Sequence, residues 1–498
     1  MIENLLAGLA LLATVDSILA LLGGVVLGVV IGSIPGMSTV MAVAVVLPFT
    51  FTMAPVPAIL LLVGVYKGGM YGGSISAILI NTPGTPAASC TMLDGNPLAR
   101  QGKARRALHM AVYASCVGDL LSNIALILMA AWLAQFALRF GAPEVFTLVV
   151  FSLTIVASVA GDRILKGLLA AVLGLGLATV GTDLITGAPR FAFDFTPLRG
   201  GLSLVPVLVG LFALPEVLRM YFRSDAGQRA VAALGEASLP AREFLRSWRT
   251  VRRGSAIGVG LGIIPGLGAT PAAFLSYSEA RRRSADPDSF GKGNPEGVAA
   301  AESGNSSVGG ATMIPLLSLG IPGDVITAVI LGAFMIHGLQ PGPLLFQNNI
   351  DVIYALFIGL MLGSLALLLI GRIAIPLLGR VIGVRSSLLL SGVLVLCVFG
   401  SYAVNNSVFD VLVMFLMGIV GLIMVATEIP RAPLLIAFVL GPLLEDNFRQ
   451  SLLMSQGSWT IFFASPITWL FWTLTVLSVV GTIYAARRNR RKAAASEG

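Results

Sequence analysis

Charged residues are scarce in this chain of 498 residues: Asp, Glu, Lys and Arg together make up only 11% of it. A soluble chain would carry roughly 25%. The shortage extends along the whole sequence, because apolar stretches recur from one end to the other and hydrophobic residues reach 56%. A membrane-spanning helix needs about 20 apolar residues, and about ten or more such stretches can be counted. The composition therefore excludes a soluble enzyme and predicts a polytopic membrane protein that has the lipid bilayer as its solvent.

Cysteine and histidine are also rare, with three and two residues. Cys90, Cys116 and Cys397 lie far apart and match no metal-binding spacing. The sequence carries no HExxH, GxSxG or P-loop motif. It therefore predicts a protein that is not an enzyme, with no metal site and no cofactor other than a coupling ion.

The net charge of +8 comes from basic residues that cluster beside apolar stretches, which indicates membrane topology rather than nucleic-acid binding. Most Lys and Arg fall in four segments, which we place in the cytoplasm: 100–106, 219–253, 281–292 and 487–492. The loops at 48–55 and 338–351 have neither residue and are placed outside. The C-terminus is then cytoplasmic, and the later spans alternate near 110–138, 143–160, 164–182, 200–221, 351–371, 386–404, 411–427, 432–446 and 461–485.

A duplicated element is visible in the sequence. The runs GVVIGSIPGMST and GVGLGIIPGLGAT place Pro35-Gly36 and Pro265-Gly266 230 residues apart. A second pair of runs, YGGSISAILINTPGT and VGGATMIPLLSLGIPGD, ends in Pro83-Gly84 and Pro322-Gly323. Either these four sites are simple helix kinks, or they are broken helices of a repeated transporter fold. Four instances in two ordered pairs favour the second interpretation.

Loop charges predict that the repeats have opposite orientations. The first Pro-Gly site is followed by the uncharged loop 48–55 in one repeat and by the basic loop 281–292 in the other. We therefore expect an all-α polytopic membrane protein with about 10–12 membrane segments, two inverted-topology repeats, re-entrant hairpins and broken helices. A carrier with parallel repeats would not show this reversal. The predicted organisation is membrane repeat one at 1–222, a cytoplasmic amphipathic linker at 223–253, membrane repeat two at 254–460, and a last span with a basic tail at 461–498.

The first breaks are predicted to be hairpins that turn near the membrane midplane. The apolar helix 254–264 would be about 16 Å long, which reaches halfway through a core of about 30 Å. Pro265-Gly266 would form its tip, and Pro35-Gly36 would form the tip of a mate that enters from the other side.

Broken helices offer unpaired backbone groups for ligands. Their N-terminal ends suit carboxylates, and their C-terminal carbonyls suit Na⁺ or H⁺. Small polar residues lie beside the breaks and either bind substrate or bond back to their own helices. They are Ser38, Asn81, Thr85, Thr270, Asn305 and Ser306.

Five charged residues near these stretches call for an interpretation. Glu302 and Asp324 flank the last break and are candidates for the coupling ion, although Asp324 equally fits a helix N-terminal acid. Asp119 lies in an apolar span with no evident partner. Lys67 either extends to the membrane surface or reaches the anion site. Asp94, in LDGNP, is expected in a cytoplasmic turn.

Several motifs together resemble the TctA family, the large membrane subunit of tripartite tricarboxylate transporters, from about residue 17 to at least residue 346. They are GSIPGMST, YKGGMYGGSISAILINTPGTPAA, LDGNPLARQGKA, GIIPGLGAT, FGKGNPEGVAAAESGN and LGIPGDVITAVILGAFMIHGLQPGPLLF. The resemblance implies that the substrate site includes the following residues of these motifs: Pro35, Gly36, Asn81, Pro83, Gly84, Thr85, Pro265, Gly266, Asn305, Pro322 and Gly323.

The resemblance implies a secondary transporter of the bacterial inner membrane that imports carboxylates such as citrate by cation symport. It also implies a small TctB-like membrane subunit and a periplasmic TctC-like binding protein. Ser306 and Asp324 depart from the family pattern and leave the particular carboxylate open. The alternatives are a stand-alone carrier or exporter of another small organic solute, and an intramembrane enzyme that uses Glu302 with Asp324.

Overall fold

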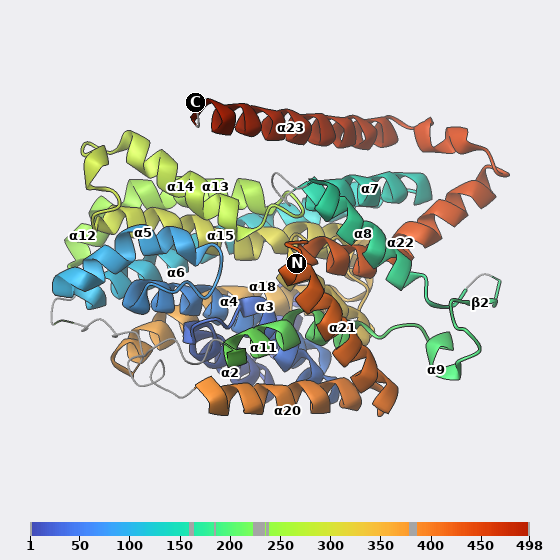
Figure 1. Ribbon diagram of the computed structural model, residues 1–498, viewed down its shortest axis with the longest axis horizontal. Helices are drawn as coiled ribbons and strands as arrows, with labels where there is room; N and C mark the ends of the chain where they lie inside the picture. The colour runs from blue at the N-terminus through green and yellow to red at the C-terminus, as the bar shows by residue number, and fades with distance from the viewer. Residues whose placement is uncertain are drawn as a thin grey trace.

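The computed structural model describes residues 2–158, 164–183, 186–222, 235, 239–377 and 386–496. This part of the chain is almost entirely helical (Figure 1). Its only strands, β1 (Gly181–Thr182) and β2 (Pro189–Arg190), form one short antiparallel pair. The predicted all-α class is therefore confirmed.

Most of the described helices follow one another closely along the chain. The first half of the chain contains α1 (Ile2–Leu12), α2 (Val15–Ser33), α3 (Thr39–Val46), η1 (Leu47–Thr52), α4 (Pro55–Ile80), α5 (Ala88–Leu98), η2 (Ala99–Lys103), α6 (Ala104–Ala137), α7 (Ala142–Ser158), α8 (Ile164–Ala178), α9 (Thr196–Arg199), α10 (Leu204–Leu208), η3 (Val209–Ala213) and α11 (Leu214–Phe222). The second half contains α12 (Ala241–Arg246), α13 (Trp248–Gly262), α14 (Ala269–Arg283), η4 (Pro287–Ser289), α15 (Pro295–Leu319), α16 (Val325–Ile336), α17 (Pro343–Asn348), α18 (Ile350–Ala374), η5 (Ile375–Leu377), α20 (Ser386–Asn405), α21 (Val408–Ala426), α22 (Arg431–Met454), η6 (Trp459–Phe463) and α23 (Pro466–Ser496).

Five stretches of the described chain are long and apolar enough to cross a membrane: Val15–Ser33, Pro55–Ile80, Ala88–Ala137, Ile350–Leu377 and Val408–Ala426. Shorter apolar helices accompany them, among them α7, α8 and α16. Large apolar side chains such as Leu19, Leu369 and Ile419 are exposed on the outside of the bundle, where lipid is the expected neighbour. The chain is therefore a polytopic membrane protein.

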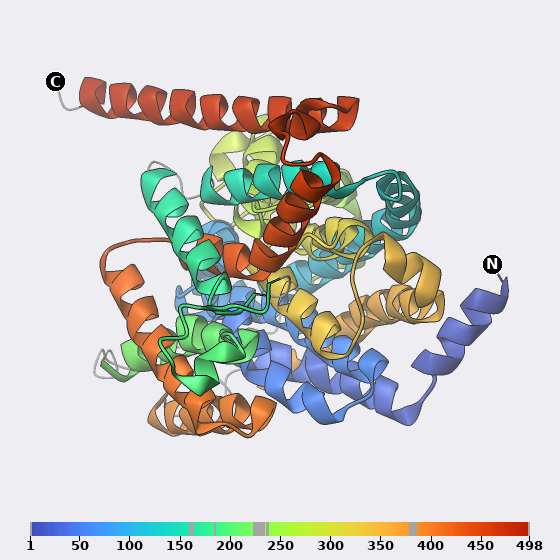
Figure 2. The same cartoon turned by 90° about the vertical axis from the view of Figure 1, so that its right-hand side faces the viewer.

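The last helix, α23, lies along one side of the bundle and extends beyond it (Figure 2). It packs against α7 and exposes an apolar face that includes Trp469, Leu470 and Leu477. The basic segment 487–492 continues this helix. Residues 223–234 and 236–238 of the linker predicted at 223–253 lie outside the described residues; its last part contains α12 and the start of α13.

A pair of helices in each half packs closely through glycines, and the glycines in the two halves are 230 residues apart in the sequence. Glycines of α2 lie against α4, and a Cβ added to Gly28 would be 2.4 Å from the carbonyl oxygen of Val65. Glycines of α13 lie against α15 in the same way, because a Cβ on Gly258 would be 2.5 Å from the carbonyl oxygen of Gly304. Such stripes of small residues are typical of helix pairs in membranes.

The breaks also match in backbone conformation. Gly36 has φ of 86° and Gly266 has φ of 87°, in the left-handed region that glycine adopts without steric cost. Helices α4 and α15 both end in left-handed C-caps, Asn81 and Gly320, two residues before Pro83 and Pro322. The duplication read from the sequence is thus visible in the local geometry of all four breaks.

The predicted hairpin around Pro265 is present, because α13 and α14 pack against each other on either side of it. Neither helix is among the five long apolar stretches. The corresponding pair in the first half is unequal, since α2 has 19 residues and is long enough to cross the membrane. The re-entrant hairpin expected with Pro35-Gly36 at its tip stays a prediction; α2 is apolar almost throughout, whereas α13 carries Arg249, Arg252 and Arg253 in its first two turns.

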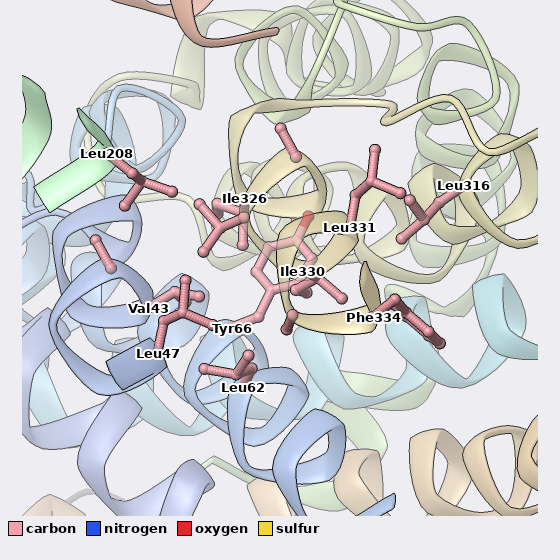
Figure 3. Close-up of a cluster of buried hydrophobic side chains, with 14 of the residues drawn as sticks. Val43, Leu47, Leu62, Tyr66, Leu208, Leu316, Ile326, Ile330, Leu331 and Phe334 are labelled. Carbon is pink, nitrogen blue, oxygen red and sulfur yellow. The ribbon is translucent and has the colours of Figure 1, made fainter. Parts of the chain in front are cut away.

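Side chains from both halves meet in the core around α16. Ile326 and Ile330 of α16 lie close to Val43 and Leu47 at the end of α3 and to Leu62 of α4 (Figure 3). Lipid is as apolar as these side chains, so close packing rather than exclusion from water holds them together. This contact fixes the start of α16 against the middle of α4.

Candidate functional site

Helices α4 and α15 form the buried centre of the molecule and run antiparallel. Ser74 of α4 donates a hydrogen bond of 2.5 Å to Glu302 of α15. Two turns away on each helix, a Cβ on Gly309 would lie 3.9 Å from the Tyr66 ring. Both helices are almost completely buried. This pair gives a frame along which the predicted site residues can be placed.

The breaks of the first half lie near one end of this frame. The N–H of Gly84 donates to the carbonyl of Gly73 at 3.2 Å, and a Cβ on Gly84 would be 2.7 Å from the carbonyl oxygen of Gly32. Thr85 is buried and its hydroxyl accepts from the N–H of Ala88 at 3.2 Å. At the outer edge of this group, Pro35 and Pro83 are half-buried, and Gly36 and Asn81 are exposed.

The breaks of the second half meet each other directly. The N–H of Gly266 donates to the carbonyl of Gly323 at 2.7 Å. Pro265 and Pro322 are buried. Thr270, the second residue of α14, is half-buried beside this contact.

The two candidate carboxylates for the coupling ion lie near different breaks. Glu302 accepts hydrogen bonds from the hydroxyls of Ser74, Thr91 and Ser115, the last at 2.7 Å. These donors come from α4, α5 and α6, and Glu302 is fully buried.

Asp324 lies at the N-terminus of α16 and forms a capping box with Thr327. Its other oxygen accepts from the Tyr66 hydroxyl at 3.1 Å. The helix N-terminal position expected as one interpretation of Asp324 is confirmed.

Asn305 and Ser306 lie between the two groups of breaks on α15. Both are buried, and both polar atoms of the Asn305 side chain and the Ser306 hydroxyl have no hydrogen-bond partner in the described part of the chain. Along α15, the stretch from Glu302 to Thr312 is about 15 Å long. A buried polar group without a partner costs about 1–3 kcal/mol. The Asn305 amide and the Ser306 hydroxyl are therefore groups that a bound ligand could satisfy.

Lys67 and Asp119 form a buried ion pair between α4 and α6, with side chains 5% and 4% exposed. Asp119 therefore has the partner that the sequence did not reveal, and Lys67 does not extend to the membrane surface. Ser364 of α18 donates to the same carboxylate oxygen at 2.6 Å, and the Asn123 amide donates to Ser364 at 2.9 Å. A cavity of about 10 Å³, close to the size of one water, lies beside the pair and is also lined by Ser306.

Asp94 is not in a turn, which corrects the expectation from LDGNP. It lies inside α5, is fully buried, and accepts from the backbone N–H groups of Gly291, Gly293 and Asn294 at 2.7–2.9 Å. The Tyr277 hydroxyl donates to it at 2.7 Å. Asp94 thus attaches the loop before α15 to the first half of the chain. The two partners are about 200 residues apart, so the local sequence around Asp94 could not indicate this contact.

Ser38 has a partner that sequence reasoning missed. Its hydroxyl lies 2.9 Å from both oxygens of Glu216 on α11, and its N–H donates to Glu216 at 3.2 Å. The Arg431 guanidinium lies 3.7 Å from Glu216. The available signals in the sequence were Glu216 near the end of the predicted span 200–221 and Arg431 directly before the span 432–446.

The predicted residues therefore form two groups at separate breaks, joined by the buried segment of α15, rather than one cluster. Among the residues that the structure describes, no group of three or more His, Cys, Asp or Glu could hold a metal ion. The arrangement offers hydroxyls, an amide and helix ends in a membrane interior.

Polytopic helices with repeated breaks and a buried polar segment between them are typical of membrane transport proteins. Residues 18–436 match the sequence model of the Tripartite tricarboxylate transporter TctA family, and the chain belongs to that family. It is 35% identical over 99% of its length to an uncharacterized 52.8 kDa protein in the TAR-I ttuC' 3'region of Agrobacterium vitis, covering 98% of that protein. An uncharacterized protein in the TAR-II ttuC' 3'region of the same organism is 34% identical over 46% of this chain and 96% of its own length. No solved structure matches.

Proposed function

We propose that this chain is the permease subunit of a secondary active transporter that imports an organic di- or tricarboxylate across the bacterial inner membrane. Uptake is coupled to Na⁺ or H⁺, and a periplasmic TctC-like binding protein delivers the substrate. A small TctB-like membrane subunit completes the complex, and the C-terminus is cytoplasmic. Family membership supports transport, and the basic segments at 281–292 and 487–492 support the orientation.

The observation that carries the proposal is the unpartnered amide and hydroxyl of Asn305 and Ser306 in a buried segment between helix breaks. An amide and a hydroxyl donate to carboxylate oxygens, and helix ends add partial positive charge. A carboxylate that enters this segment gives these groups the partners that the protein does not.

A coupling cation offsets the charge of the substrate anion inside the membrane, where an isolated charge is costly. Glu302 and Asp324 are the carboxylates that the sequence suggested for this ion. Each is held by protein hydroxyls in the structure, three for Glu302 and those of Tyr66 and Thr327 for Asp324.

Uptake by the reconstituted complex tests the proposal. The permease, with its membrane subunit, is placed in proteoliposomes and supplied with binding protein and radiolabelled citrate or succinate, under an inward Na⁺ or H⁺ gradient. We expect accumulation of a carboxylate, and we expect Asn305→Ala to reduce the initial rate about tenfold, which corresponds to about 1.4 kcal/mol of lost binding.

Ser318→Ala is the matched control. Ser318 is also buried on α15, but its hydroxyl already donates to the carbonyl of Ile314 at 2.5 Å, so its removal should leave uptake unchanged. Equal losses in both variants would contradict the assignment of Asn305. Uptake at the same rate without the binding protein would favour the stand-alone carrier.

A further inference from the structure

We infer that the Lys67–Asp119 pair is the proton-operated part of the substrate site, in which protonation of Asp119 frees the Lys67 ammonium to bind a substrate carboxylate. This inference rests on the proposed function and deepens it, because it assigns the coupling ion as a proton and gives the anion a cationic partner.

The Lys67–Asp119 pair borders a small cavity that Ser306 also lines. Lys67 and Ser364 both donate to the same oxygen of Asp119, Oδ2. The second oxygen, Oδ1, lies on the side of α15, where a Cβ on Gly309 would be 3.5 Å away. The small cavity beside the pair is lined by Tyr66, Lys67, Asp119, Ser306 and Gly309. The ammonium and the unpartnered Ser306 hydroxyl therefore share one space.

The chemistry of the pair makes it a switch. A buried ion pair is stable as a pair, but removing one charge leaves the other uncompensated. When Asp119 takes a proton, Lys67 becomes an uncompensated cation in the membrane interior, and a carboxylate is the partner that restores neutrality. The cavity has room for about one water, so substrate entry requires the surrounding helices to separate.

The titratable groups around the pair do not offer a second cation. They are Tyr66 and Tyr71 on α4, Cys116 on α6, Glu302 on α15, and Asp324, which accepts a hydrogen bond from the Tyr66 hydroxyl. On α18, Tyr354 and Arg372 lie two or more turns from Ser364, and on α2 the charged residue is Asp16 in the first turn. Among the described residues that face the pair, Lys67 is therefore the one available partner for an anion.

Asp119 differs from Glu302 and Asp324, the two carboxylates predicted for the coupling ion, in having a charged partner. Glu302 is bonded by three hydroxyls, and Asp324 caps a helix; protonation of either releases no cation. Only at Asp119, of these three, does the gain of a proton create a binding group for the substrate.

The proton balance is one proton for each carboxylate that Lys67 binds. Asp119 takes a proton from the outer compartment, and the Lys67 ammonium changes its partner from Asp119 to the substrate carboxylate. After the substrate leaves to the cytoplasm, Asp119 releases its proton there and the ion pair forms again. Net transport is substrate and proton in the same direction.

The test uses the complete transporter complex in proteoliposomes with radiolabelled citrate and succinate. For the wild type we expect a proton gradient alone to drive accumulation, with a rate that falls up to about tenfold for each unit rise in external pH, the limit for one titrating group. Asp119→Asn should lose accumulation of the substrate and the pH dependence of uptake. It should keep substrate flux down the substrate's own concentration gradient, because the Lys67 ammonium is then always free to bind a carboxylate. Lys67→Met should lose binding.

A double variant separates this role from a purely structural one. Replacing both members of a buried ion pair is often neutral for stability, so Lys67→Met/Asp119→Asn should keep the wild-type melting temperature but transport nothing. The matched control removes the partly exposed pair at the edge of the bundle, Arg106→Met/Glu243→Gln, and should transport like the wild type.

Three results would overturn the inference. They are accumulation by Asp119→Asn at the wild-type rate, transport by the double variant, and wild-type accumulation that follows Na⁺ with no response to pH. If Asp119→Asn does not fold, the double variant decides. Carboxylate uptake with any of these results leaves the proposed function intact, whereas a wild-type complex that moves no carboxylate under either gradient refutes both.

Discussion

Gly266 and Gly323 are joined by a backbone hydrogen bond of 2.7 Å, so the two Pro-Gly breaks of the second half form one structural unit. The bond links the tip of the α13–α14 hairpin to the loop between α15 and α16. A backbone N–H and a carbonyl that helices normally pair internally are here paired with each other. In a membrane interior, where an unpaired group costs several kcal/mol, this is a reason for the breaks to coincide.

Alanine at either glycine should disrupt this unit. A Cβ on Gly323 would be 2.7 Å from Cβ of Thr312, and alanine at Gly266 would have φ of 87° and meet the Val156 backbone at 2.9 Å. We expect each variant to lose about 1–3 kcal/mol of stability, seen as a lower melting temperature in detergent. Gly260→Ala is the control, since nothing lies within 4 Å of its added Cβ. Wild-type melting of Gly323→Ala would show that the loop adjusts without cost.

The repeated glycine stripe predicts equal sensitivity in the two halves. Gly28→Ala and Gly258→Ala place a methyl group 2.4 and 2.5 Å from carbonyl oxygens of the facing helices. Both should therefore lower the melting temperature by similar amounts, through about 1–3 kcal/mol of overpacking. Gly23→Ala, on α2 but in open space, should not. A large effect at one stripe and none at the other would mean that the halves are not packed alike.

The duplication could be predicted from the sequence because it is local and repeated. The Pro-Gly pairs recur at a fixed offset, and the same backbone torsions appear at Gly36 and Gly266. The unequal first helices could not be predicted as well, because the offset shows equivalence but not length. α13 carries Arg252 and Arg253 where α2 is apolar, and this difference limits its apolar stretch.

The sequence could not predict which side chains of the site contact each other when they lie on different helices. Lys67 and Asp119 are 52 residues apart on two long helices, and no local pattern fixes which faces meet. Asp94 looks like a turn residue in LDGNP, yet its carboxylate binds a loop about 200 residues away. Asn305 could be proposed from the family motif, but its lack of a partner required the positions of all the surrounding helices.

Opposite orientation of the repeats can be measured by accessibility. We expect Thr52→Cys and Asp288→Cys, both at exposed positions, to react with a membrane-impermeant thiol reagent from opposite sides of sealed vesicles. The native Cys90, Cys116 and Cys397 are buried and should give little background. Labelling of both from the same side would refute the inverted topology.

Substitution of Glu302 compares two candidates for the residue that binds the coupling ion: Glu302, predicted from the sequence, and Asp119, inferred from the structure. Its three partners are hydroxyls, which can rotate to accept from an amide as readily as they donate to a carboxylate. Glu302→Gln should therefore keep the wild-type melting temperature and the same pH dependence of uptake. Glu302→Ala should melt at a lower temperature, because it leaves three buried hydroxyls without their acceptor at about 1–3 kcal/mol each.

The opposite result would locate the coupling ion elsewhere. A Glu302→Gln variant that folds and exchanges substrate but no longer accumulates it would show that the ion binds at Glu302. Asp119→Asn measured beside it would then keep accumulation, because the proton would not pass through the Lys67 pair. Since each substitution is close to isosteric, the two variants together decide which buried carboxylate of this fold carries the ion.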